Sequence, residues 1–286
     1  MARCSTSAII LVVLCTVQQT SSQLSSARRD NATSGWEGRR VVALKGFGEY
    51  FAQMEDGETK LVKPDGLSVN IVAVVQKAEG DRVWIKANGN GDRPVGWINR
   101  RDAVLLEDAI PYFTTKITRE PSDWDSFLRR AESEHALNRR DEAIADYTSA
   151  IKLNGHEPFL FLRRGREYRI LKDCPHAASD FEQAARLRPG WAEAYDMAAG
   201  VYADCPDPSH RDQAKAIELI NRAMALSPNP TYLTVLALAY FRSGDLERAV
   251  TSQKQAVESP QFPPGYRDDA LRQLQIYKKA LAAEKR

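Results

Sequence analysis

Two cysteines and two histidines in neighbouring segments are the residues of this sequence best placed to do chemistry. His176 follows Cys174 closely, and His210 follows Cys205. Two sulfur and two nitrogen atoms could bind zinc, but this spacing matches no compact zinc module. The other use of the cysteines is a disulfide, which forms in an oxidising compartment and needs Cα atoms within about 7 Å of each other. We therefore expect no metal site, and the sequence leaves open whether Cys174 and Cys205 are paired.

Sequence motifs of catalysis are missing from the chain. It has no Gly-x-Ser-x-Gly, no His-Glu-x-x-His and no glycine-rich phosphate loop. Its 40 basic and 38 acidic residues give a formal net charge of +2, and no basic block marks a nucleic-acid-binding face. We predict a protein that is not an enzyme, has no cofactor and does not bind nucleic acid.

The elements that would position the cysteines belong to a repeat of about 34 residues. Ala109, Ala143 and Ala177 are spaced by 34, and the register continues with Ala216 and Ala249 after steps of 39 and 33. Self-similarity at this period is typical of a solenoid of helix pairs, because one pair alone cannot bury its apolar face. The residues four positions after these alanines are, in turn, Phe113, Tyr147, Phe181, Ile220 and Gln253.

The pattern resembles the tetratricopeptide repeat, in which large, small and aromatic residues recur along the first helix and alanine recurs along the second. The second unit carries at these places Phe161, Gly165, Tyr168, Ala177, Phe181, Ala184 and Pro189. We expect Gly165, Ala199 and Ala237 where the helices of a pair cross, because small side chains let two backbones approach closely. The prediction is half a repeat and four helix pairs over residues 107–264, then a capping helix over residues 265–286.

The resemblance implies a binding groove lined by first-helix side chains. The residues expected to line it are Leu128, Glu132, His135, Phe159, Leu162, Arg166, Arg169, Glu193, Asp196, Gly200, Thr231, Thr234, Leu238 and Phe241. Arg166 and Arg169 suit an extended or helical protein segment with acidic and apolar residues. The Lys and Asn side chains of the carboxylate clamp that holds chaperone tails are missing, because Leu128 and Glu132 stand there. We therefore expect a protein partner other than a heat-shock chaperone tail.

The first residues have the layout of a secretory signal. An apolar run from Ala8 to Leu14 is followed by a polar stretch, and it is about half as long as a membrane-spanning helix needs to be. We predict a signal peptide over residues 1–22 and a flexible linker over residues 23–38, hence a periplasmic or secreted protein. Two alternatives stay open: an uncleaved N-terminal membrane anchor, and lipidation at Cys15, although Leu14 is larger than the residue a lipobox has there.

The third helix pair departs from the repeat. Its connecting loop, DCPDPSHRDQAK, carries five extra residues and two prolines, which we expect to end the preceding helix early. This stretch resembles a variant common in exported bacterial tetratricopeptide proteins. The resemblance is a second reason to predict export.

Residues 39–106 have a different pattern, with short runs rich in Val and Ile between turn residues. The expected strands cover residues 41–44, 67–75, 83–87 and 95–98. The run from Asp81 to Val104, with Trp84 and Trp97, resembles the second half of a bacterial Src-homology-3-like domain. This resemblance implies a small non-enzymatic β barrel that contacts cell-wall material or protein segments. The two tryptophans either close the small core or form an aromatic ligand surface.

Together these features predict a multidomain protein, with a small all-β Src-homology-3-like barrel followed by an all-α tetratricopeptide-repeat solenoid. Its expected function is that of a non-enzymatic exported scaffold or adaptor that binds a protein partner through the groove. The alternative is recognition of a cell-wall or surface polymer by the barrel, with the helical repeats as a spacer.

Overall fold

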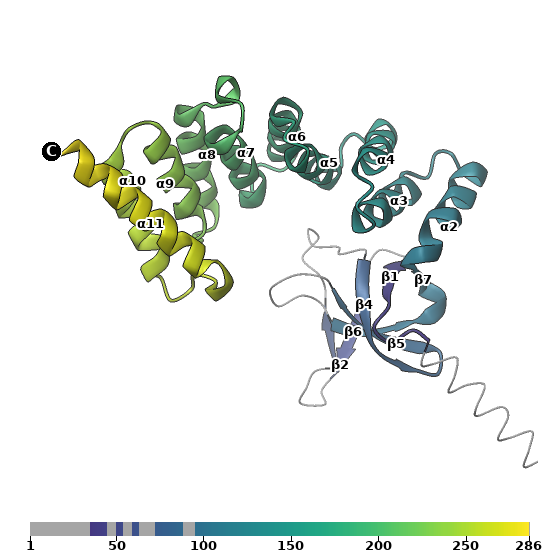
Figure 1. Ribbon diagram of the computed structural model, residues 1–286. Helices are drawn as coiled ribbons and strands as arrows, with labels where there is room; N and C mark the ends of the chain where they lie inside the picture. The colour runs from purple at the N-terminus through teal and green to yellow at the C-terminus, as the bar shows by residue number, and fades with distance from the viewer. Residues whose placement is uncertain (1–34, 45–49, 54–58, 63–71, 88–94, 286) are drawn as a thin grey trace, which may run out of the picture. The chain divides into compact units, whose positions relative to one another are not determined.

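The computed structural model describes residues 35–44, 50–53, 59–62, 72–87 and 95–285 (Figure 1). The predicted signal peptide and most of the predicted linker lie outside these residues. Contacts divide the chain into two units, and the boundary falls after Lys116. No helix in the described ranges is long and apolar enough to cross a membrane.

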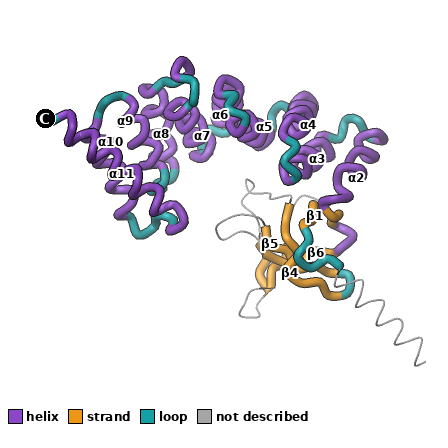
Figure 2. The backbone as a smooth tube through the Cα atoms, in the orientation of Figure 1, coloured by secondary structure: helices purple, strands orange, loops and turns teal. Residues whose placement is uncertain are grey.

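The first unit is built on antiparallel strands (Figure 2). Five of them form one sheet in the order β6-β5-β4-β1-β7, and β2 pairs with β3. Their bounds are β1 Arg40–Ala43, β2 Tyr50–Gln53, β3 Thr59–Val62, β4 Val72–Glu79, β5 Arg82–Ala87, β6 Val95–Asn99 and β7 Ala103–Leu105. The turn between β4 and β5 contains Gly80, whose φ of 53° favours glycine. The predicted small antiparallel sheet is thus present, and its closure into a barrel stays a prediction.

The main buried cluster of the sheet lies on one of its faces. Its buried residues are Val41, Ala73, Val75, Val83, Ile85 and Ala103, with Trp36, Ala78, Ile98 and Leu105 packed against them. Successive residues of a strand point to opposite faces, so Trp84, between Val83 and Ile85, points away from this cluster. Trp84 is paired directly with Trp97 of β6, whose neighbour Ile98 packs on the cluster. Both tryptophans therefore lie on the opposite face from this core.

Helix α2 (Leu106–Arg119) follows β7 without a linker, and Arg39 forms an ion pair with Glu107 in its first turn. Ala109 and Phe113 are buried, in agreement with the predicted small-then-aromatic spacing. Pro111 lies inside α2, beyond its first turn. The backbone bond that Pro111 cannot donate belongs to an exposed side of α2, where water can replace it.

The second unit is a solenoid of helix pairs. Its helices are α3 Trp124–Ala136, α4 Arg140–Leu153, α5 Pro158–Ile170, α6 Cys174–Leu187, α7 Ala192–Asp204, α8 Gln213–Leu226, α9 Tyr232–Arg242, α10 Leu246–Glu258 and α11 Pro264–Glu284. Contacts join α3 with α4, α5 with α6, α7 with α8 and α9 with α10, and α11 packs on α10 (Figure 1). The helical solenoid predicted from the repeat is confirmed.

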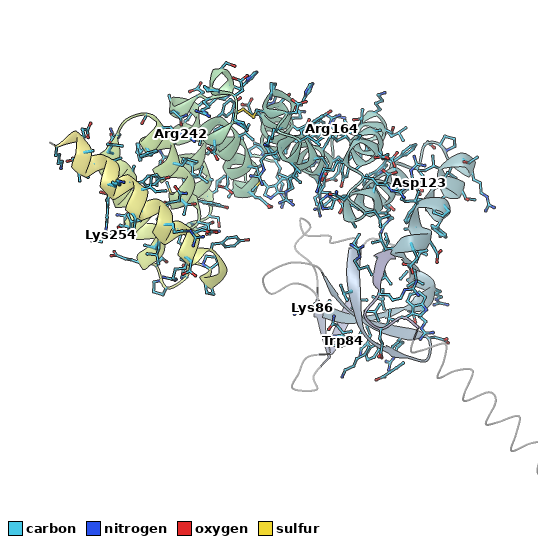
Figure 3. All side chains as sticks on the ribbon, in the orientation of Figure 1. Trp84, Lys86, Asp123, Arg164, Arg242 and Lys254 are labelled. Atoms are coloured by element: carbon cyan, nitrogen blue, oxygen red, sulfur yellow. A yellow bond between two sulfur atoms is a disulfide. The ribbon has the colours of Figure 1, made fainter. Side chains whose placement is uncertain are left out.

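Capping and close packing explain why the chain folds into these pairs. Asp123, Asp173, Asp212 and Asp245 precede helices and accept backbone N–H bonds from the first turn of each (Figure 3 labels Asp123). Gly165 lies at the crossing of α5 and α6, where a Cβ atom would be 2.9 Å from the Phe181 ring. The equivalent positions in the next two pairs are Ala199 and Ala237, and both are fully buried.

A disulfide links the second pair to the third. The sulfur atoms of Cys174 and Cys205 are 2.11 Å apart and their Cα atoms are 6.1 Å apart. Cys174 begins α6 and Cys205 ends α7, before a 3-10 turn at Pro208–His210. Both cysteines are buried. The helix ends pack against each other there and cover the sulfur atoms.

Candidate functional site

Bidentate ion pairs connect the helices of the first two pairs. Arg130 on α3 donates from Nε and Nη2 to Asp146 on α4, at 2.6 and 2.7 Å. Arg164 on α5 makes the same two contacts with Asp180 on α6, at 2.9 and 2.7 Å (Figure 3 labels Arg164). These partners recur at the repeat spacing of 34, and the third pair has alanine and leucine at the corresponding positions. We call these two ion pairs the Arg–Asp ladder.

Four of the residues predicted to line the groove are buried in the scaffold instead. They are Leu128, Glu132, Phe159 and Leu162. Glu132 accepts a hydrogen bond from the Tyr147 hydroxyl at 2.7 Å and forms an ion pair with Arg163, 3.0 Å away. The Arg163 guanidinium also lies 4.5 Å from the centroid of the Phe159 ring. These side chains hold neighbouring helices together, and none of the four lines a pocket described below.

His135, also predicted to line the groove, borders a small pocket of about 280 Å³ between α3, α5 and α7. Its Nδ1 atom is 2.6 Å from Glu167, which also accepts a bond from Arg140 at 2.8 Å. The hydrogen bond to Glu167 raises the pKa of His135, despite the opposing effect of burial. Glu167 therefore pairs with both His135 and Arg140 within the protein.

The structure places the two arginines predicted to line the groove in different environments. Arg166 forms an ion pair with Glu193 of α7, and burial lowers the pKa of the Arg166 guanidinium. Arg169, one turn further along α5, is exposed. Arg166 is therefore neutralised within the protein, and the expected doubly cationic surface for an acidic partner is reduced to Arg169.

A larger groove of about 760 Å³ opens further along the solenoid, with walls from α7, α9 and α11. Five predicted residues line it: Arg169, Asp196, Thr231, Thr234 and Leu238. The other lining residues are Asp204, Val235, Arg242, Gln253, Phe262, Tyr266, Asp269, Ala270, Gln273 and Tyr277. We call this surface the C-terminal groove. The predicted Phe241 does not line the groove and stacks on Tyr277, with ring centroids 4.5 Å apart. Gly200 is half-buried on α7.

Most charged groups of the C-terminal groove have partners. Arg242, labelled in Figure 3, lies 3.1 Å from Asp204, and Asp269 forms an ion pair with Arg272. Asp196 is different, because it forms no ion pair or hydrogen bond with any residue that the structure describes. Burial raises the pKa of Asp196 to about 6, and the nearby charge of Glu193 adds to this effect. Asp196 is thus a half-buried carboxylate without an ion pair, and the cation that acts on it from a distance is Arg169.

Gln253 is one of the lining residues that the groove prediction missed. It occupies the position on α10 where other repeats have Phe113, Tyr147 and Phe181, and it is 1% exposed. Its Nε2 atom donates to the backbone oxygen of Ala270 on α11 at 2.9 Å. Its Oε1 atom is buried without a hydrogen-bond partner among the described residues. The sequence signal that could have identified Gln253 is a polar residue at a position where other repeats have an aromatic one.

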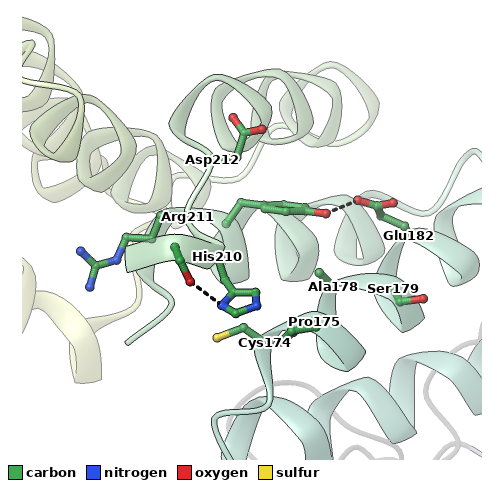
Figure 4. Close-up of a pocket in the computed structure, with 10 residues that line it drawn as sticks. Cys174, Pro175, Ala178, Ser179, Glu182, His210, Arg211 and Asp212 are labelled. Atoms are coloured by element: carbon green, nitrogen blue, oxygen red, sulfur yellow. Dashed lines mark hydrogen bonds between the residues drawn. The ribbon is translucent and has the colours of Figure 1, made fainter. Parts of the chain in front are cut away.

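A third pocket, of about 430 Å³, borders the disulfide (Figure 4). The Tyr202 hydroxyl donates to Glu182 at 2.6 Å, and Lys215 pairs with Glu182 as well. Arg211 donates from Nε to the backbone oxygen of Cys205 at 2.6 Å. The polar groups around this pocket therefore satisfy one another. The paired sulfur atoms are not available as zinc ligands, and the described residues contain no group of three or more side chains suited to hold a metal ion.

Comparison with known proteins gives the class of the repeat. Residues 230–261, which span α9 and α10, match the tetratricopeptide repeat family. The chain therefore contains a tetratricopeptide repeat, and the preceding helix pairs share its small residues at the crossing. No curated protein matches the chain.

Solved structures of tetratricopeptide-repeat (TPR) proteins are similar to the chain but distant from it. MamA from Desulfovibrio magneticus RS-1 is 20% identical with a TM-score of 0.49, over 54% of this chain and 84% of that one. TTC0263, a thermophilic TPR protein of Thermus thermophilus, is 20% identical with a TM-score of 0.44, over 62% and 91%. YrrB, described as a TPR protein with an unusual peptide-binding site, is 18% identical with a TM-score of 0.47, over 61% and 98%.

Proposed function

We propose that this protein is a non-enzymatic scaffold that binds a protein partner in the C-terminal groove. The observation that carries the proposal is the groove itself, about 760 Å³ in volume, with apolar and polar side chains from α7, α9 and α11. Grooves of this size take an extended segment or a helix from a partner, with apolar contacts for affinity and a few polar groups for orientation. The buried polar groups of the first two helix pairs serve the scaffold.

A site-specific photo-crosslinker tests this proposal. A benzophenone side chain at Thr234 lies in the groove, and the same group at Glu218 lies on the exposed face of α8. In cells that express the full chain, we expect a crosslinked protein at position 234 and none of that identity at position 218. Equal crosslinking at both positions, or crosslinking at position 218 alone, would contradict binding in the groove.

We further propose that the protein acts after export, in a periplasmic or secreted form. The apolar N-terminal run and the buried Cys174–Cys205 pair support this location, because disulfides persist in oxidising compartments. An uncleaved signal segment would anchor the same protein to the membrane. Intact mass of the protein recovered outside the cytoplasm, with and without reduction and alkylation, measures cleavage and pairing together. A full-length, alkylated cytoplasmic protein would contradict export.

The second candidate function is polymer recognition by the sheet unit, as a Src-homology-3-like barrel. The supporting observation is an aromatic pair on the face away from the described core: Trp84 and Trp97 lie 5.5 Å apart with their rings inclined at 75° (Figure 3 labels Trp84). The Arg82 guanidinium lies 4.8 Å from the Trp97 ring. Half-buried tryptophans beside a cation suit a sugar or peptide ligand. Retention of the full chain on purified cell-wall material, and its loss in Trp97→Ala with unchanged thermal unfolding, would support this candidate.

A further inference from the structure

The C-terminal groove has hydrogen-bond acceptors that lack donors. Asp196 lines its α7 wall and Gln253 lines it from α10. Neither the Asp196 carboxylate nor Gln253 Oε1 has a hydrogen-bond partner in the described part of the chain. An unpartnered buried acceptor costs about 1–3 kcal/mol, so Gln253 Oε1 is unfavourable unless a ligand supplies a donor, and the half-buried Asp196 carboxylate in the same groove is open to a second donor.

The orientation of Gln253 follows from its one contact. Its amide nitrogen faces the Ala270 carbonyl, and exchanging the two amide atoms would place oxygen against oxygen. Oε1 is therefore the free atom of this side chain. Because Gln253 is 1% exposed, bulk water does not solvate Oε1, and a donor from an occupant of the groove reaches this atom only when the side chains that cover Gln253 move aside.

The charged groups around Asp196 leave its carboxylate without an ion pair. Arg169 on α5 acts on it at a distance, and Glu193 on α7 opposes that effect. Glu193 is itself engaged by Arg166, and on α9 the charge of Asp196 helps to raise the pKa of Tyr232. On α11, Asp269 is already paired with Arg272. A positive group placed at Asp196 would meet a carboxylate without an ion pair, whereas an acidic group would meet repulsion.

Apolar side chains form the remaining walls. Leu238 and Val235 come from α9, and Phe262, Tyr266 and Tyr277 come from α11 and the loop before it. Tyr266 is 56% exposed, so the groove is open to solvent at this side. A lysine or arginine side chain fits such a site, because its aliphatic stem packs on apolar surface while its head group donates hydrogen bonds.

We propose that the C-terminal groove selects an extended partner segment with a lysine or arginine next to an apolar residue. The cation pairs with Asp196, and an N–H group of the same segment donates to Gln253 Oε1. This proposal rests on the proposed function and specifies the chemistry of its partner. It replaces the acidic partner expected from the sequence, since Arg166 is taken by Glu193.

An oriented peptide library tests the charge preference. The probes are N-acetylated, C-amidated heptapeptides in which each position is fixed in turn as Lys, Arg, norleucine, Gln or Glu, with apolar residues at the others. On immobilised full-length protein at pH 7.5, we expect one position where Lys or Arg is retained at least fivefold over norleucine and Glu. Equal retention of Lys and norleucine, or a preference for Glu, would overturn the proposal.

Matched variants identify the residue that causes the preference for a basic side chain. Asp196→Asn should reduce the Lys-over-norleucine ratio to below twofold, while Asp268→Asn, on an exposed part of α11 outside the groove, should leave it unchanged. Gln253→Met should weaken all peptides by a similar factor, because it removes an acceptor and no charge. A preference that survives Asp196→Asn contradicts the assignment. Thermal unfolding of each variant shows that the fold is kept.

The same experiment separates this proposal from the proposed function. If peptides are retained without a basic preference and Thr234→Trp abolishes their retention, the groove binds peptides and the basic partner is wrong. If no peptide is retained and the crosslinker at position 234 finds no protein, both proposals fail.

Discussion

The two ends of the helical unit differ in whether their buried and half-buried polar groups have partners. In α3–α6, Arg130 and Arg164 are clamped by Asp146 and Asp180, and a third carboxylate, Glu132, is held by Tyr147 and Arg163. In α7–α11 the ladder stops, and Asp196 and Gln253 line a groove without such partners. The first arrangement holds helices together, and the second leaves interactions to be made by a partner.

Glu134 shows that location matters as well as pairing. Its carboxyl group is buried on α3 with one oxygen lacking a partner among the described residues. Burial, with a contribution from Asp146, raises its pKa to about 7, so it can lose its charge near neutral pH. It lines none of the three pockets described above. An unpaired acceptor therefore indicates a binding site only when it also borders a groove.

Breaking the ladder should have the largest effect on stability. Arg164→Leu leaves Asp180 buried without its cation, and we expect a loss of about 3–5 kcal/mol in the free energy of unfolding. Replacing both partners, as Arg164→Leu with Asp180→Leu, should recover most of this loss, because no buried charge is left. Urea unfolding measures both. A single variant that loses under about 1 kcal/mol would show that the ladder is not structural.

The disulfide joins the two regions of this comparison, since Cys174 belongs to α6 and Cys205 to α7. The cysteines are 31 residues apart, and closing a loop of that size contributes about 2–4 kcal/mol. Cys174→Ser with Cys205→Ser should lower the free energy of unfolding by this amount under oxidising conditions. In a reducing agent the wild type should fall to the same value. If the reducing agent leaves wild-type unfolding unchanged, the bond does not form in solution.

Two glycines test the difference in packing between a helix crossing and an open helix surface. A Cβ atom at Gly165 would contact the Phe181 ring at 2.9 Å, whereas one at Gly200 would meet nothing within 4 Å. We expect Gly165→Ala to destabilise by about 1–3 kcal/mol through overpacking. Gly200→Ala should stabilise by up to about 1 kcal/mol, because alanine is the better helix former. Thermal unfolding distinguishes the two, and equal effects would contradict the crossing assigned to Gly165.

Asp196 should make the stability of the protein depend on pH. Its pKa is raised to about 6 in the folded protein, so the folded state binds the proton more tightly than the unfolded state does. The stability that Asp196 contributes is therefore greatest below about pH 4 and is lost as the pH rises to about 6. Asp196→Asn should remove this slope and stabilise the protein by about 1–2 kcal/mol at pH 7.5. Unfolding at pH 5 and pH 7.5 measures it, with Asp268→Asn as control.

The fold was largely predictable because the repeat spacing is a packing signal. Small residues such as Gly165 and Ala237 must recur wherever two helices cross, and this recurrence is visible in sequence. The groove was predictable only in part. Leu128 and Leu162 follow the same spacing as Asp196 and Thr234, but the spacing does not show which of these positions a neighbouring helix covers.

The ion pairs could not be read from the sequence for a related reason. Arg130 and Asp146 are 16 residues apart, and each stands among other charged residues that look like a solvated helix face. Their burial depends on how α3 and α4 pack. Gln253 was visible as a polar residue in an aromatic position, but its free oxygen is defined only by the contact with Ala270 of α11.

The most direct test of the account is an NMR titration of the full-length protein with the basic peptide that the library selects. We predict that the largest chemical-shift changes fall on α7, α9 and α11, and include the backbone amide of Asp196 and the side-chain amide of Gln253. Residues of the Arg–Asp ladder should change little. Shifts concentrated on α3–α6 or on the sheet, with Asp196 and Gln253 unaffected, would contradict the division between a structural and a binding region.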